Sequence, residues 1–343
     1  MKRAGLVLLL LAAAAVAFQA AGGYHLLKKI PLGAAEGGGE YFDYITFDAA
    51  SRRVYLSHGT EIEVLDADSG SVVGKIGGLK RAHGVALVPD LGKGFITDGD
   101  AGEVIVFDVK TLKPTGRIKA DADADSILYD AASKRIFVFN GEPKSCTVID
   151  PAMGISVATL PLGGAPEQAV ADGKGMIYDN LEDTNEVIAL DARTLKITAR
   201  WPVAPGGSPV SIAMDREHRR LFVAGRNPAS LVMMNADTGK IIGQPFPIGA
   251  RVDANVYDPS TGMVASATGE GTIHIFHEDS PDKLSLVETV KSEFGAKTMA
   301  FDPKTHNLLL DTSDFEPAAA ATGKKAPQPR AKPGTFRLLI YGR

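Results

Sequence analysis

The stretch VYLSHGTEIEVLDADSG, from Val54 to Gly70, contains two short β-strand patterns joined by a tight turn. Both patterns, VYLSH and IEVLD, are rich in the branched and aromatic residues that favour strands. Asp66 ends the second pattern, and an aspartate at the start of a turn can accept hydrogen bonds from the backbone N–H groups that follow. The stretch therefore predicts a β-hairpin followed by a turn that its aspartate stabilises.

The same arrangement recurs along the chain. The second residues of the equivalent first patterns are Tyr55, Phe95, Phe137, Ile177, Phe222, Val264 and Leu309, at steps of 40, 42, 40, 45, 42 and 45 residues. Another strand pattern precedes each hairpin, as in DYITFD, and a fourth pattern follows it, as in SVVGKI. Four short strands repeated at this spacing are typical of a β-propeller blade. The turn aspartates Asp66, Asp108, Asp150 and Asp191 are predicted to be structural.

The two ends of the chain indicate how the ring closes. The last repeat stops after its third strand, TFRLLIYG, whereas the segment from Tyr24 to Leu32 precedes the first repeat and has the pattern of a fourth strand. Pairing these two segments would remove the exposed edges of an open array. We therefore predict an all-β fold, a seven-bladed β-propeller of four-stranded blades in which the N-terminal strand completes the last blade.

The first residues of the chain have the features of a secretory signal peptide. Lys2 and Arg3 precede an apolar run and then small residues. The apolar run is shorter than the ~20 residues of a membrane-spanning helix. We expect residues 1–21 to be a cleaved signal peptide, with an uncleaved anchor as the alternative, and residues 22–343 to be a single propeller. The protein is then expected to be periplasmic or secreted, with no stable membrane span after cleavage.

Residues 314–334 form a long insertion in the last repeat. Their high Ala, Pro and Lys content cannot build a core and favours a mobile loop on the face of the ring. We expect this loop to act either as a lid or docking arm or as a tolerated surface insertion.

Composition excludes several classes of site. The formal charge of −4 disfavours nucleic acid as a partner, because binding to phosphate backbones needs a clustered basic surface. Cys146 is the only cysteine, which excludes an intramolecular disulfide and a thiolate zinc site. We expect a monomer whose partner is a protein or a small-molecule ligand.

Two of the repeats resemble a known family. Residues 54–76, VYLSHGTEIEVLDADSGSVVGKI, and residues 221–243, LFVAGRNPASLVMMNADTGKIIG, are similar to the Y-V-T-N repeat of YncE-like β-propellers, which are exported bacterial proteins. The likeness extends over residues 24–343 and implies the propeller fold and export, but no particular reaction. The motif's final asparagine position holds His58, Asp98, Asn140, Asn180, Gly225, Ala267 and Thr312, so only two blades keep it.

The residues that begin the first strand of each repeat are expected to meet at the mouth of the central channel. They are Asp43, His83, Asp125, Glu167, Ser208–Ser211, Asp253 and Lys297. The segment KADADADSILYD, Lys119 to Asp130, has the D-x-D-x-D opening of a calcium loop but lacks the later glycine and glutamate that such a loop needs. We therefore assign Asp125 to the ring at the mouth, and Asp121 and Asp123 to the loop that leads into it.

Carboxylates that converge on one axis repel one another unless their charge is compensated. The set Asp43, Asp125, Glu167 and Asp253 is expected either to form a polar channel mouth, relieved by His83, Lys297 and water, or to bind a divalent cation such as Ca²⁺ or Mg²⁺. The second-strand ends His58, Asp98, Asn140 and Asn180 could complete the shell around such a cation.

From these observations we expect a binding or scaffold module at the channel face, without catalysis. The alternative is a divalent-metal-dependent lactonase or hydrolase that uses the acidic ring. Glu167, Asn180 and Asp253 match in type the metal ligands of gluconolactonase-type propellers. Those enzymes have six blades, whereas seven are predicted here, and no catalytic residue can be assigned from the sequence.

Overall fold

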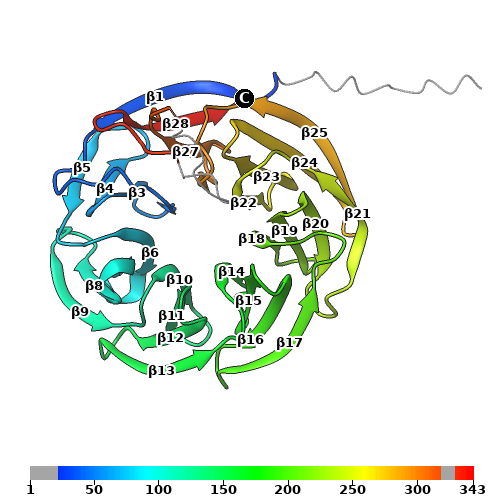
Figure 1. The fold of residues 1–343 in the computed structure, drawn as a ribbon, viewed down its shortest axis with the longest axis horizontal. Helices are drawn as coiled ribbons and strands as arrows, with labels where there is room; N and C mark the ends of the chain where they lie inside the picture. Colours follow the sequence, from blue (N-terminus) through cyan, green and yellow to red (C-terminus); the bar gives the residue numbers. More distant parts are fainter. Residues whose placement is uncertain (1–21, 318–328) are drawn as a thin grey trace, which may run out of the picture.

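The computed structural model describes residues 22–317 and 329–343 and shows seven four-stranded antiparallel sheets arranged in a ring (Figure 1). The prediction of a seven-bladed all-β propeller is confirmed. The predicted signal peptide, residues 1–21, and the middle of the predicted loop, residues 318–328, lie outside the described residues. Within the described part of the chain, no helix is long and apolar enough to cross a membrane.

The strands of each blade follow one another from the centre of the ring outward. Blade 1 comprises β2 (Ile45–Asp48), β3 (Arg53–His58), β4 (Glu61–Asp66) and β5 (Val72–Ile76). Blade 2 comprises β6 (Ala82–Val88), β7 (Lys93–Asp98), β8 (Glu103–Asp108) and β9 (Pro114–Lys119), with the short 3₁₀ helices η1 (Pro89–Leu91) and η2 (Gly99–Ala101) in its turns. Blade 3 comprises β10 (Ala124–Asp130), β11 (Arg135–Asn140), β12 (Ser145–Asp150) and β13 (Ile155–Pro161).

The remaining blades repeat this order. Blade 4 comprises β14 (Pro166–Ala171), β15 (Met176–Leu181), β16 (Glu186–Asp191) and β17 (Lys196–Pro202). Blade 5 comprises β18 (Pro209–Asp215), β19 (Arg220–Arg226), β20 (Ala229–Asn235) and β21 (Ile241–Pro247). Blade 6 comprises β22 (Val252–Asp258), β23 (Met263–Thr268), β24 (Thr272–Ser280) and β25 (Lys283–Lys291). Blade 7 comprises β26 (Met299–Phe301), β27 (Leu308–Thr312), β28 (Phe336–Gly342) and β1 (His25–Gly33).

The second strands of the blades carry much of the core. Their aligned residues are all at most 2% exposed: Tyr55, Phe95, Phe137, Ile177, Phe222, Val264 and Leu309. Successive side chains of a strand point to opposite faces, so each blade packs against the blade before it and the blade after it. Between blades 1 and 2, for example, the rings of Tyr55 and Phe107 lie 5.9 Å apart in a cluster that includes Ile62. Strands that are buried on both faces therefore need the nearly continuous apolar pattern that the sequence repeats.

The aspartates at the ends of the third strands stabilise turns, as predicted. The carboxylate of Asp66 accepts a hydrogen bond from the Ser69 N–H at 2.8 Å, and that of Asp191 accepts one from the Thr194 N–H at 2.8 Å. Asp108 and Asp150 accept equivalent bonds from the residues that follow them. These carboxylates shape the turns between the third and fourth strands.

Blade 7 contains both ends of the described chain (Figure 1). Strand β1 pairs antiparallel with β28, from His25 opposite Gly342 to Gly33 opposite Phe336. Ile30 of β1 and Phe336 of β28 lie in one apolar cluster with Leu56 of blade 1. The predicted closure by the N-terminal strand is therefore consistent with this sheet.

The insertion at residues 314–334 joins the second and third strands of blade 7, β27 and β28, as the repeat predicts. Its described ends come together at an isolated bridge between Phe315 and Ala331. The ring of Phe315 lies 6.3 Å from that of Phe42, so the ends of the insertion lie against the segment that leads into blade 1.

Candidate functional site at the mouth of the channel

Asp43, His83 and Asp125, from the starts of blades 1, 2 and 3, lie in contact. The Nδ1 atom of His83 is 2.9 Å from Asp43 Oδ2 and 2.9 Å from Asp125 Oδ1. The first strands line the axis side by side, so residues at the same position of adjacent blades meet there. The histidine is almost fully buried between the two carboxyl groups.

The two carboxyl groups favour the charged form of His83. Burial lowers the pKa of His83, but hydrogen bonds and charge attraction from Asp125 and Asp43 outweigh burial and raise this pKa to about 10. Burial would raise the pKa of Asp43, yet the hydrogen bond and charge of His83 bring it down to about 2. Burial raises the pKa of Asp125. The hydrogen bond from His83 lowers this pKa and the charge of Asp43 raises it, so the net shift is upward. At neutral pH the cluster therefore holds an imidazolium between two carboxyl groups.

Asp253, from the start of blade 6, is neutralised by two cations. Its Oδ1 accepts a hydrogen bond from Arg226 and its Oδ2 accepts one from Lys297. Lys297, from the start of blade 7, therefore compensates the negative charge of Asp253 in the ring. Sequence analysis missed Arg226, which immediately follows the motif position Gly225 and is the charged residue that blade 5 contributes.

Glu167 of blade 4 and the serines that begin blade 5 add little charge to the ring. Burial raises the pKa of Glu167 well above its usual value. The positive charge of Arg226 lowers this pKa, but the negative charges of Asp125 and Asp253 offset that effect. This shift favours the neutral acid. In blade 5, the backbone N–H of Ser208 donates to Asn185 Oδ1 at 2.7 Å, and Ser211 is buried.

Two tyrosines complete the ring, and sequence analysis missed both. The Tyr41 hydroxyl donates to Asp43 Oδ2 at 2.5 Å. Burial raises the pKa of Tyr44 well above its usual value, and the negative charges around it raise it further; they come from Asp125, Asp43, Glu167 and Asp253. Tyr44 therefore lies among the four carboxyl groups that the repeat places at the mouth. The segment YFDY, in which the two tyrosines flank Asp43, was the available signal.

The second-strand ends form bonds inside or beside their own blades. His58 bonds to Glu63 at 2.9 Å and to Glu40 at 3.0 Å. The carboxylate of Asp98 accepts hydrogen bonds from the backbone N–H groups of Lys80 and Arg81, both at 2.9 Å. Asn140 donates to Ser145 Oγ and Thr147 Oγ1, both at 3.1 Å, and Asn180 is buried. Three of the four are thus engaged in local structure.

The ring fits a network of internal ion pairs better than a hard cation. Among the described residues of the ring, those able to bring ligand atoms within 4.8 Å of one another are Asp43, His83 and Asp125. Ca²⁺ and Mg²⁺ prefer oxygen ligands, whereas the atom at the centre of this cluster is a nitrogen, Nδ1 of His83. Asp253 is already paired with two cations, and the pKa of Glu167 favours the neutral acid.

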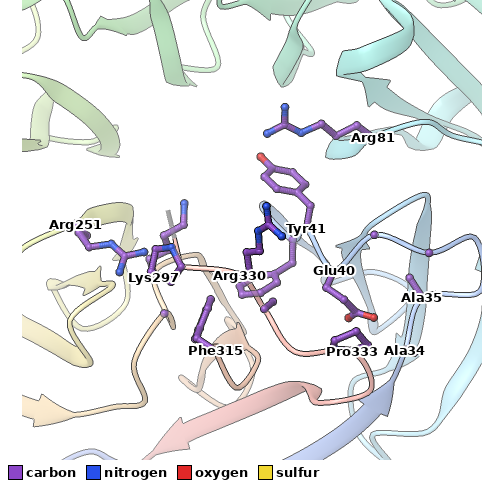
Figure 2. A pocket seen from close by; sticks show the side chains of 16 residues that line it. Ala34, Ala35, Glu40, Tyr41, Arg81, Arg251, Lys297, Phe315, Arg330 and Pro333 are labelled. Carbon is purple, nitrogen blue, oxygen red and sulfur yellow. The ribbon is translucent and has the colours of Figure 1, made fainter. Parts of the chain in front are cut away.

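A cavity of about 880 Å³ lies beside this network, and we call it the mouth pocket. Its walls come from the segment before blade 1, the starts of blades 2, 6 and 7, and the described ends of the insertion. The lining residues are Ala34, Ala35, Gly38, Gly39, Glu40, Tyr41, Phe42, Arg81, Arg251, Gly295, Lys297, Phe315, Pro329, Arg330, Ala331 and Pro333. Figure 2 shows the side chains of Arg81, Arg251, Lys297 and Arg330 extending toward one open space.

The network and the mouth pocket share two residues. Tyr41 donates to Asp43 in the network, and its ring lies 4.1 Å beneath the guanidinium of Arg81 in the pocket. Lys297 bonds to Asp253 and also lines the pocket. A hydrogen bond and an ion pair of the network therefore hold two of the pocket's side chains in place.

Comparisons with solved structures identify the fold. A chain in the crystal structure of the mitotic checkpoint complex aligns with a TM-score of 0.74 and 15% identity, over 100% of this chain and 99% of that one. The crystal structure of RRP9 WD40 repeats aligns with a TM-score of 0.71 and 10% identity, over 90% and 99% of the two chains. Hydrazine synthase of Kuenenia stuttgartiensis aligns with a TM-score of 0.69 and 13% identity, over 78% and 91%.

At these identities the similarity establishes the seven-bladed propeller fold alone. No protein-family model and no curated protein matches the chain.

Proposed function

We propose that this chain is an exported, monomeric propeller of the YncE-like type that binds a small ligand in the mouth pocket without catalysis. The observation that carries the proposal is the mouth pocket itself. It has a volume of about 880 Å³, within the range of ~300–1,000 Å³ that is common for small-molecule sites. It lies on the face of the ring where the starts of the first strands converge, which is the usual position for binding in this architecture.

The chemistry around the pocket supports binding rather than reaction. A general acid or base needs to be free to exchange a proton near neutral pH. His83 is held charged between two carboxyl groups, and Asp253 is held by two cations. We assign no catalytic residue and no cofactor, and we expect the periplasm or the extracellular space as the location.

The test is a thermal-shift and calorimetry screen of the chain lacking residues 1–21 against neutral, cationic and anionic small molecules. Ala34→Trp would fill part of the mouth pocket. Ala131→Trp adds the same side chain at an exposed position in the β10–β11 turn and serves as the control. We expect at least one class of compound to bind, and the binding to be lost in Ala34→Trp and kept in Ala131→Trp. Absence of binding by every class, or equal binding by both variants, would contradict the proposal.

The divalent-metal-dependent lactonase or hydrolase is a second candidate function that the ring disfavours. Elemental analysis of the purified protein and a melting scan with and without a chelator separate the two. A ligand-binding module whose ring is held by ion pairs should melt at the same temperature in both conditions. A stoichiometric Ca²⁺ or Mg²⁺ that is lost with the double substitution Asp125→Ala and Glu167→Ala would favour the enzyme.

A further inference from the structure

The mouth pocket concentrates positive charge in a chain that is acidic overall. Its lining carries the cations Arg81, Arg251, Lys297 and Arg330, and among the described residues of the lining Glu40 is the one carboxylate. Glu40 is already bonded to the Nε2 of His58 at 3.0 Å. The whole chain has a formal charge of −4, so this local excess does not reflect composition.

Two of these cations lack a carboxylate partner. Within residues 22–317 and 329–343, neither Arg251 nor Arg330 forms an ion pair, and the guanidinium of Arg251 lies 5.1 Å from the centre of the Phe294 ring. Residues 1–21 and 318–328 contain no aspartate or glutamate, so they could not supply a carboxylate side chain. No acidic side chain of the protein therefore pairs with either of these two positive charges.

The third arginine is only weakly compensated. Arg81 lies over the ring of Tyr41 and is 3.8 Å from Asp100, whose side chain is 59% exposed to solvent. An exposed ion pair of this length contributes little, because water screens it. Lys297 differs, since Asp253 holds it directly. The pocket therefore has three arginines available to a ligand and one lysine that adds to the positive field.

The rest of the lining is apolar. Phe42 and Phe315 face the pocket together with alanines and with Pro329 and Pro333. The rings of Phe42 and Phe315 are 6.3 Å apart, and Phe42 also packs 5.4 Å from Phe336 of β28. An apolar or aromatic body could lie on these side chains while its charged groups meet the guanidinium groups. Arginine suits this role, because its planar fork matches carboxylate and phosphate oxygens in pairs.

We infer that the ligand of the mouth pocket is a small organic anion with at least two negative charges and an apolar body. This inference rests on the proposed function. The charged groups, carboxylate or phosphate, bind Arg81, Arg251 and Arg330, and the body packs on Phe42 and Phe315. Like-charged guanidinium groups that share one cavity repel one another, and an anion bound between them relieves that repulsion.

The test uses isothermal titration calorimetry with a matched set of probes: phthalate, phenyl phosphate, benzoate, benzamide and benzamidine. We expect phthalate and phenyl phosphate to bind at least about tenfold more tightly than neutral benzamide, a difference of roughly 1.4 kcal/mol. The affinity of benzoate should fall between that of the dianions and that of benzamide, and cationic benzamidine should not bind. Comparing the first two probes also separates a carboxylate ligand from a phosphate ligand.

Two variants identify the side chains responsible. The double substitution Arg81→Gln and Arg251→Gln should weaken binding of both dianions at least about tenfold. Arg193→Gln, at an exposed turn between β16 and β17, removes one positive charge away from the pocket and should leave binding within about twofold. Circular dichroism and melting scans verify that each variant is folded.

The outcomes separate this inference from the proposed function. If benzamide or benzamidine binds as well as the dianions do, and binding is lost in Ala34→Trp, the pocket binds ligands but the anion inference is wrong. If no probe binds at millimolar concentration, both are contradicted. An acidic peptide or a single-stranded oligonucleotide that binds the pocket more tightly than the dianions, with loss in the double variant, would overturn the inference in favour of a macromolecular anion.

Discussion

At the scale of single residues, His83 is central to the mouth of the channel. It lies 2.9 Å from one oxygen of Asp43 and 2.9 Å from one oxygen of Asp125 and is almost fully buried. A buried charge that loses its partner is costly, because neither water nor another group replaces the lost attraction. The ion pairs of His83 therefore hold blades 1, 2 and 3 together at the axis.

We expect His83→Gln to lower the free energy of unfolding by ~3 kcal/mol, because it removes the cation that lies between the buried carboxyl group of Asp43 and the partly buried one of Asp125. Urea denaturation at pH 7 measures this change. His25→Gln is the matched control, since His25 is exposed at the start of β1, and it should change the free energy of unfolding by less than ~0.5 kcal/mol. Equal effects of the two substitutions would show that the buried ion pairs do not contribute.

The same residue predicts a dependence of stability on pH. The pKa of His83 is raised in the folded protein to about 10 from an ordinary value of 6.5. Its stabilising contribution should therefore be complete below pH ~6.5 and be lost as the pH rises toward ~10. We expect the difference in free energy of unfolding between wild type and His83→Gln to shrink steadily from pH 6.5 to pH 10 in urea titrations. A difference that stays constant over this range would contradict a charged His83.

At the scale of the strands and turns, the turn between β20 and β21 of blade 5, residues 235–239, depends on its last residue. Gly239 adopts a φ of +70°, and a Cβ atom added there would lie 2.0 Å from Cγ of Trp201 in blade 4. The turn of one blade thus packs on the outer strand, β17, of the preceding blade. Gly243 in β21 has nearly the same φ, +72°, but a Cβ atom there would meet nothing within 4 Å.

This pair of glycines separates backbone strain from steric conflict. Gly243→Ala should lower the free energy of unfolding by ~1 kcal/mol through strain alone. Gly239→Ala should lower it by ~3 kcal/mol, because a clash with Trp201 is added to the same strain. Trp201 is the only tryptophan, so its fluorescence should change in the folded state of Gly239→Ala and not in that of Gly243→Ala. Similar losses and spectra would show that the contact with Trp201 can relax at no cost.

At the scale of the whole molecule, the ring is held closed by one strand. Strand β1 covers the outer edge of β28 and adds Ile30 to the cluster between blades 7 and 1. Without β1, the edge of β28 would expose unpaired backbone groups to other chains. Closure by a strand that is distant in sequence makes the stability of blade 1 depend on the last residues of the chain.

We expect deletion of residues 22–33, in addition to 1–21, to lower the melting temperature and to produce oligomers in size-exclusion chromatography. The chain lacking only residues 1–21 is the control and should remain a monomer. A milder test compares two substitutions in β1. Ile30→Ala should lower the free energy of unfolding by ~2–4 kcal/mol, because Ile30 is buried. Leu27→Ala should lower it by less than ~1 kcal/mol, because the side chain of Leu27 is about half exposed. A monomer of unchanged melting temperature after the longer deletion would contradict closure by β1.

The sequence by itself was sufficient to determine the architecture. The spacing of residues such as Tyr55, Phe95 and Phe137 identifies the blades, because a strand buried on both faces needs the same apolar pattern in every repeat. The same spacing identifies which residues begin the first strands, and so it placed Asp43, His83 and Asp125 at one end of the channel. The turn aspartates were equally predictable, since their hydrogen bonds are local.

The tertiary structure alone decided how the charges pair and where the pocket lies. Arg226 of blade 5 bonds to Asp253 of the adjacent blade 6, and Tyr44 lies among carboxyl groups from four blades, so neither contact has a signal within one repeat. The mouth pocket joins Arg81, Arg251 and Arg330, which are far apart in sequence and meet because the ring closes. Repeats determine local packing because their contacts are regular, whereas loops and side-chain charges combine only once all seven blades are in place.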